Sequence, residues 1–90
     1  MKLVTLSPAE LPDLPALHAL LARQLDFPAW YGANLDALYD LLTERTEPID
    51  LVLTDPRALR FQLGKDYDRF LRVLRDAQEA GADINILVNS

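Results

Sequence analysis

The chain has 90 residues, of which 50% are apolar and 26% are charged, and 14 acidic against 9 basic side chains give a formal net charge of −5. This length and composition are typical of a folded globular protein, so we expect a single domain over residues 1–90. The absence of cysteine excludes disulfides and thiolate sites and fits a cytoplasmic protein, and the single histidine, His18, excludes a pair of imidazole ligands. No apolar run approaches the roughly 20 residues that span a bilayer, so we expect no membrane partner.

Apolar periodicity and capping residues predict a regular alternation of strands and helices. In chain order these are a strand over 2–6, a helix from Asp13 that ends before Pro28, a loop over 26–33, a helix from Asn34 that ends at Glu47-Pro48, a strand over 49–53, a short helix from Asp55 to near Gly64, a helix over 66–80 followed by Gly81, and a strand over 84–88. Strands separated by helical connections favour parallel pairing. The prediction is therefore an α/β fold, a three-stranded parallel sheet with about four helices in the order β-αα-β-αα-β.

The negative charge is concentrated in the middle third of the chain. Residues 26–55 carry seven acidic side chains and one basic side chain, whereas residues 56–90 carry six basic and five acidic ones. Because phosphate contacts need a basic surface, direct binding of nucleic acid is disfavoured, and a basic protein is the complementary partner. A solvated acidic face that keeps the protein in solution is the alternative interpretation.

The predicted second helix has two different faces. Its apolar stripe consists of Leu35, Leu38 and Leu42, with Tyr39 at the flank. Three carboxylates at spacing i, i+4 and i+8 lie on the opposite side, with Thr43 beside them: Asp36, Asp40 and Glu44, which we call the acidic ridge. Folding does not require Asp40 or Glu44 to be acidic, and like charges at i, i+4 cost a few tenths of a kcal/mol.

The loop before this helix is rich in aromatic residues, and we call residues 26–33 the aromatic loop. Trp30 and Tyr31 lie next to the acidic ridge, and we expect Gly32 to adopt an unusual backbone angle. Aromatic side chains beside charged ones are typical of protein interfaces. The alternative is that one or both rings cover the end of the core.

Enzymatic chemistry is disfavoured by the same residues. Asp36 and Asp40 could serve as a carboxylate pair for glycoside hydrolysis or for a metal, but neighbours on one exposed helix face form a convex surface, and catalytic pairs need a cleft. His18 falls near the leucines of the first helix and is expected to pack there rather than act as a base or ligand. The sequence has neither a GxSxG turn nor a glycine-rich phosphate loop.

Two segments resemble the barstar family of intracellular ribonuclease inhibitors. They are residues 27–40 (FPAWYGANLDALYD) and residues 73–87 (VLRDAQEAGADINIL), and Leu17-His18 also fits the family's first helix. The resemblance covers nearly the whole chain and is weakest between about Arg45 and Tyr67. It implies the same three-stranded parallel fold and no cofactor.

The resemblance also implies a partner, a basic extracellular-type ribonuclease similar to barnase, blocked one-to-one by the acidic helix and the loop before it. In the family, carboxylates occupy sites meant for RNA phosphates, and the match assigns Asp36 and Asp40 to these sites, with Asp40 deepest. Trp30 matches an aromatic residue that packs on the enzyme. The other positions that match the family's interface or shape its binding loop are Gly32, Asn34, Tyr39, Thr43 and Asp76.

Three positions depart from the family's pattern: Glu44 replaces a glycine, Arg45 an interface tryptophan, and Ala80 an acidic residue. They bear on the identity of the partner more than on the fold. The leading prediction is a barstar-like ribonuclease inhibitor, with Tyr31 and Glu44 added to the binding residues from the loop and the ridge. A barstar-fold module for another basic partner is the second interpretation, and a carboxylate-dependent hydrolase is the third.

Overall fold

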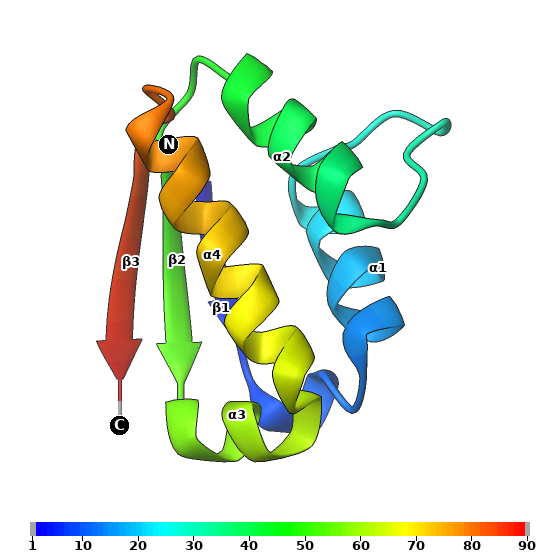
Figure 1. Ribbon diagram of the computed structural model, residues 1–90, viewed down its shortest axis with the longest axis vertical. Coiled ribbons are helices and arrows are strands. Elements are labelled where there is room, and N and C mark those ends of the chain that lie inside the picture. The colour runs from blue at the N-terminus through cyan, green and yellow to red at the C-terminus, as the bar shows by residue number, and fades with distance from the viewer. Residues whose placement is uncertain (1, 90) are drawn as a thin grey trace.

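The computed structural model describes residues 2–89 and confirms the predicted α/β fold, a three-stranded parallel sheet with four helices (Figure 1). In chain order the elements are β1 (Lys2–Leu6), a 3-10 turn η1 (Pro8–Glu10), α1 (Leu14–Gln24), α2 (Leu35–Glu44), β2 (Ile49–Thr54), α3 (Pro56–Leu63), α4 (Lys65–Glu79) and β3 (Ile84–Asn89). Asp13, Asn34 and Asp55 cap α1, α2 and α3 as predicted, since each side chain accepts a backbone N–H from the first turn.

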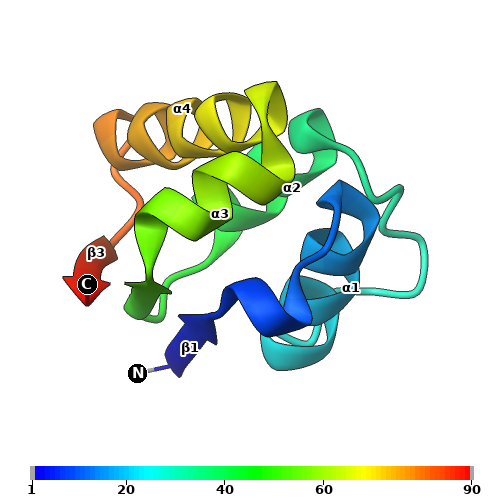
Figure 2. The same ribbon diagram turned by 90° about the horizontal axis from the view of Figure 1, so that it is seen from below.

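The sheet has the strand order β1-β2-β3, with β2 in the centre and both pairs parallel. In register, Val4 pairs with Leu51 and Leu51 with Ile86, so these side chains share one face of the sheet. The helices lie on this face, and α3 crosses the end of the sheet at which β2 finishes (Figures 1 and 2). The opposite face is open to solvent, which leaves Leu3 62% and Leu87 48% exposed.

The core between sheet and helices consists mainly of leucine side chains. Leu38 and Leu42 of α2 are 0% and 2% exposed, and α2 packs against α4, whose Phe70 and Leu74 are each 1% exposed. Burial of one leucine side chain contributes about 1.5–3 kcal/mol relative to exposure. The apolar stripe of α2 therefore fixes how this helix is rotated, and with it the direction in which the opposite face points.

Apart from shifts of one residue at the ends of β2, α4 and β3, the elements differ from the prediction in two places. The turn η1 was not predicted, because three residues carry no periodicity. The helix α2 ends at Glu44, three residues before the predicted end at Glu47, and Arg45 is already extended, with ψ of 142°. Beyond this end the Arg45 side chain makes a long-range contact, which is described below.

None of the helices described for residues 2–89 has both the length and the apolar character needed to cross a membrane.

Candidate partner-binding surface

The acidic ridge lies on the solvent side of α2. Asp36, Asp40 and Glu44 are all exposed, whereas Leu38 and Leu42 on the other side of the same helix are buried. Within residues 2–89 none of the three carboxylates forms an ion pair. The predicted geometry of the ridge is confirmed, and its negative charge is open to a partner.

The start of α2 is fixed by a local cap. Asn34 Oδ1 accepts the backbone N–H of Ala37 at 2.8 Å, and Asn34 Nδ2 donates to the Gly32 carbonyl at 3.4 Å. A Cβ atom at position 32 would come within 2.9 Å of Asn34 Nδ2, so a larger residue there would displace the end of this side chain. The expectation of an unusual backbone angle at Gly32 was wrong. The positive φ angles lie at the ends of the aromatic loop instead, at Asp26 (54°) and Ala33 (50°).

The two neighbouring aromatic rings of the loop have different environments. Trp30 is 71% exposed, whereas Tyr31 is half-buried and packs against the core. The Tyr31 ring meets the Phe27 ring edge-on, with 4.9 Å between centroids, and its hydroxyl forms a hydrogen bond of 2.5 Å with His18 Nδ1. The core-covering interpretation is therefore confirmed for Tyr31, whereas the Trp30 ring is left exposed to solvent.

His18 is a buried core residue, as predicted, with 2% of its surface exposed. Burial lowers its pKa from the usual 6.5, and the negative charge of Asp66 on α4 opposes this shift. Burial also raises the pKa of the Tyr31 phenol to about 12. Both groups of the pair are therefore neutral at pH 7.

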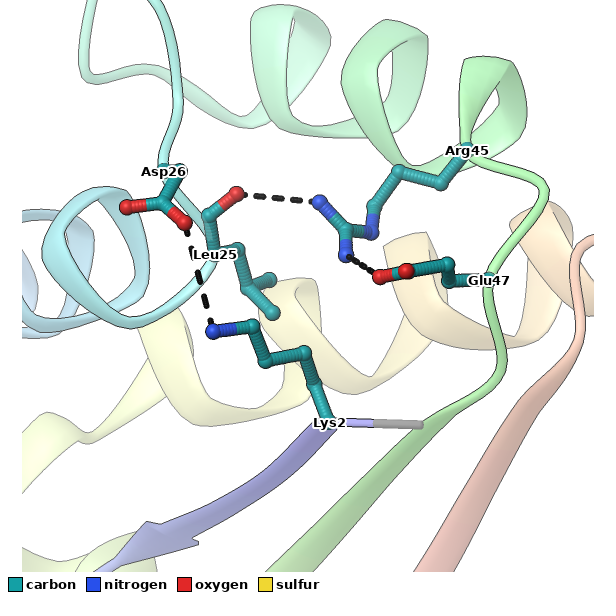
Figure 3. Close-up of polar contacts among 5 residues, drawn as sticks. All are labelled: Lys2, Leu25, Asp26, Arg45 and Glu47. Atoms are coloured by element: carbon teal, nitrogen blue, oxygen red, sulfur yellow. Dashed lines mark hydrogen bonds and ion pairs between the residues drawn. The ribbon is translucent and has the colours of Figure 1, made fainter.

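Arg45 fastens the start of the aromatic loop to the end of α2 (Figure 3). Its Nη1 donates to the Leu25 carbonyl at 2.9 Å, and its Nη2 donates to Glu47 Oε2 at 3.3 Å. A longer ion pair of 3.9 Å joins Lys2 and Asp26 at the surface. The Arg45 side chain is only 20% exposed, so its guanidinium points back into the protein rather than toward a partner.

The remaining predicted residues surround the ridge in different ways. Tyr39 is half-buried and packs against the core. The Thr43 hydroxyl lies within hydrogen-bond distance of two backbone carbonyls of its own helix, those of Tyr39 at 2.9 Å and Asp40 at 3.0 Å, and shares its hydrogen between them. Asp76 is exposed on α4, the helix against which α2 packs. The ridge and the aromatic loop thus adjoin in sequence, with Asp76 on the neighbouring helix.

A second polar surface lies on α3 and the first turns of α4. A hollow of about 540 Å³ is lined there by Pro56, Arg57, Arg60, Phe61 and Tyr67. Phe61 is 89% exposed, and the Arg60 guanidinium lies 5.1 Å from the centre of the Tyr67 ring. Sequence reasoning assigned nothing to this surface, although two arginines and an aromatic residue within five positions give a signal for it.

A metal site has little support from the geometry. In the part of the chain that the structure describes, no three His, Cys, Asp or Glu side chains are grouped so that they could hold a metal ion.

Comparison with known proteins agrees with the fold. Residues 1–89 match the family model of Barstar (barnase inhibitor). The chain is also 38% identical over 80 residues to a Bacillus subtilis (strain 168) protein named "Putative ribonuclease inhibitor YrdF", with 88% of each chain covered. The parallel sheet, the acidic α2 and these matches lead to one conclusion: the chain belongs to the barstar family.

Proposed function

We propose that this chain inhibits a barnase-type ribonuclease by inserting the acidic ridge and the aromatic loop into the enzyme's active site. One observation carries the proposal: Asp36, Asp40 and Glu44 stand exposed on successive turns of α2, and none is paired within the described residues. An enzyme that binds RNA has a basic cleft, and carboxylates in a row can take the places of the phosphates.

We assign different roles to the proposed binding residues. Asp40, in the middle of the ridge, contributes most and Asp36 next, while Glu44 extends the ridge toward the end of α2. The packing and peripheral contacts fall to Trp30, Tyr39, Thr43 and Asp76, and the shape of the loop falls to Tyr31, Gly32 and Asn34. Inhibition is one-to-one, takes place in the cytoplasm and uses no cofactor.

An inhibitor fits the family and the site better than an enzyme. The carboxylates of α2 lie on one exposed helix face, in contact with solvent. Hydrolytic carboxylate pairs act in clefts that exclude water and shift one pKa. A helix with exposed carboxylates can block a cleft, but it cannot itself enclose a substrate.

The test is inhibition of RNA hydrolysis by barnase and a small panel of secreted guanyl-preferring ribonucleases, at about 50 mM and about 1 M salt. We expect stoichiometric inhibition that weakens at high salt, because the screening length falls to about 3 Å at 1 M. A variant with both Asp36→Asn and Asp40→Asn should no longer inhibit RNA hydrolysis. Glu10→Ala removes one exposed carboxylate from η1, outside the binding surface, and should inhibit like the parent. Failure to inhibit any of these enzymes at low salt would contradict the proposal.

A basic partner other than a ribonuclease is the second candidate, favoured by one feature of the ridge. Glu44 adds an exposed carboxylate where the resemblance implies glycine, so the negative surface is longer than expected from the family. Binding of a basic protein that is not a ribonuclease, lost when Asp36, Asp40 and Glu44 are neutralised and found together with no inhibition of the ribonuclease panel, would separate this candidate from the first.

A further inference from the structure

The aromatic loop is attached to α1 by a pair of buried polar groups. His18 on α1 is 2% exposed, and its Nδ1 lies 2.5 Å from the Tyr31 hydroxyl, with the two rings edge-on at 5.7 Å between centroids. The other side of the Tyr31 ring meets Phe27 at the start of the loop. Side chains from α1, from the start of the loop and from its far end are therefore joined through one tyrosine.

Tyr31 also determines the path of the backbone around Trp30. The Tyr31 N–H donates to the Pro28 carbonyl at 2.9 Å, which closes a turn with Trp30 at its third position. The Trp30 side chain itself is 71% exposed and does not pack against the core. The direction of Trp30 therefore depends on a turn whose last residue is the tyrosine bonded to His18.

We propose that His18 is a positioning residue for partner recognition, which holds Tyr31 so that the aromatic loop presents Trp30 in one geometry. The proposal has two parts. That His18 orders the loop is independent of the proposed function, whereas the effect of this order on affinity for a ribonuclease rests on it. His18 is too deeply buried to touch a partner, so it acts only through Tyr31. Preorganisation of this kind raises affinity because less conformational entropy is lost on binding.

The charge environment of His18 makes this attachment sensitive to pH. His18 Nε2 is buried without a partner within residues 2–89, so an added proton would place a charge in a site that cannot solvate it. Two ionisable groups face the ring, Tyr31 from the loop and Asp66 from α4, and Asp66 is itself paired with Arg69 at 3.5 Å. Protonation makes Nδ1 a donor, so the Tyr31 hydroxyl has to turn from donor to acceptor, and the buried positive charge weakens the attachment; we therefore expect acid to loosen the loop.

Trp30 is the only tryptophan and His18 the only histidine, so each gives one native signal without labelling. The first experiment uses the free protein, from pH 8 to pH 5, and measures Trp30 anisotropy decay, acrylamide quenching and the His18 proton resonances. In the parent we expect Trp30 to become more mobile as His18 titrates, at a midpoint below 6.5. Tyr31→Phe should make Trp30 mobile over the whole range. His18→Gln, which does not titrate, should remove the pH dependence.

A matched control removes a tyrosine hydroxyl elsewhere. Tyr67→Phe acts on a buried residue of α4 at the α3 hollow and should leave the Trp30 signal unchanged. If His18→Gln fails to fold, Tyr31→Phe still decides the question, since it removes one oxygen and keeps the contact with Phe27. Trp30 mobility that is the same in Tyr31→Phe and the parent would overturn the proposal.

The second experiment measures affinity for barnase with both single variants and the double variant. We expect each single variant to bind about threefold to tenfold more weakly at pH 7, the equivalent of one hydrogen bond, and the double variant to add little. Parent and variants are measured against the same enzyme at the same pH, so the ionisation state of the enzyme affects all affinities equally and drops out of their ratio. Additive losses would overturn the proposal. Ordered-loop signals with no binding of the parent to barnase or to any other ribonuclease of the panel would leave the attachment intact and contradict the proposed function alone.

Discussion

The acidic ridge on α2 and the surface of α3 and α4 are both exposed and charged, but they differ in whether their charged side chains form ion pairs within the protein. On α3 and α4, Arg60 pairs with Asp68 at 2.9 Å and Arg69 pairs with Asp66 at 3.5 Å. The carboxylates of the ridge have no such partners in the described chain. Exposed pairs within a protein contribute little to its stability, about 0–1 kcal/mol, and they leave less charge for an external partner. Under the proposed function, it is this unpaired negative charge of the ridge that a basic partner would meet.

The two surfaces also differ in what supports them. The ridge adjoins a loop fastened by Arg45, by the His18–Tyr31 pair and by the Asn34 cap. The α3 surface has a hollow and an almost fully exposed Phe61, and α3 is attached to the segment around η1 by Gln62, whose Nε2 donates to the Pro8 and Leu11 carbonyls at 2.7 and 3.0 Å. A partner that meets the ridge therefore finds a surface already held in one shape.

The strongest test of the comparison is Asp40→Ala. We expect the complex with the cognate ribonuclease to weaken by about 2–5 kcal/mol, a general range for removing one partner of a buried charge pair that is drawn in part from the barnase–barstar complex itself. Titration calorimetry measures the loss, and Glu10→Ala is the control. Affinity equal to that of the parent would remove the ridge from the interface. The unfolding free energy should change by less than about 0.5 kcal/mol, since Asp40 is exposed.

Leu38→Ala should have the opposite profile, because Leu38 lies on the buried side of the same helix. It is 0% exposed, so truncation should lower the unfolding free energy by about 2–5 kcal/mol. Urea denaturation measures this loss. Under conditions where the variant is fully folded, we expect barnase binding to fall much less than in Asp40→Ala. A larger effect on binding than on stability would show that the two faces of α2 are not independent.

The third prediction compares Arg45→Ala with Arg57→Ala, because Arg45 is largely buried and Arg57 is exposed. Removal of Arg45 leaves the Leu25 carbonyl without its donor, and we expect a loss of about 1–3 kcal/mol in unfolding free energy. Arg57→Ala, at an exposed arginine of α3, should change stability and barnase affinity by less than about 0.5 kcal/mol. Equal effects of the two changes in thermal denaturation would contradict the fastening role of Arg45.

The smallest expected effect is the dependence of stability on pH. Because burial lowers the pKa of His18 in the folded state, the unfolded state binds more protons below about 6.5, and stability falls as the pH drops below this value. Urea midpoints from pH 8 to pH 5 measure the trend, and His18→Gln should make it shallower. The other ionisable groups are common to both proteins, so the difference between the two curves isolates His18.

Local signals explain most of what could be predicted from the sequence. Capping by Asp13, Asn34 and Asp55, and the opposite placement of leucines and carboxylates on α2, depend on residues within a few positions of one another. Long-range contacts could not be predicted in this way. The direction of Arg45 depends on a carbonyl twenty residues earlier, and the division of labour between Trp30 and Tyr31 depends on a histidine thirteen residues from the tyrosine.

The two-faced construction of α2 has a consequence for how such inhibitors diverge. Its leucines hold the fold, while its exposed residues contribute almost nothing to stability, so mutations can accumulate on the outer face without passing through unfolded intermediates. When the cleft of a ribonuclease changes by mutation, single substitutions on the exposed face of the inhibitor's helix can then restore the fit. Glu44, on this outer face, is a position at which such matched change between the two proteins could be traced.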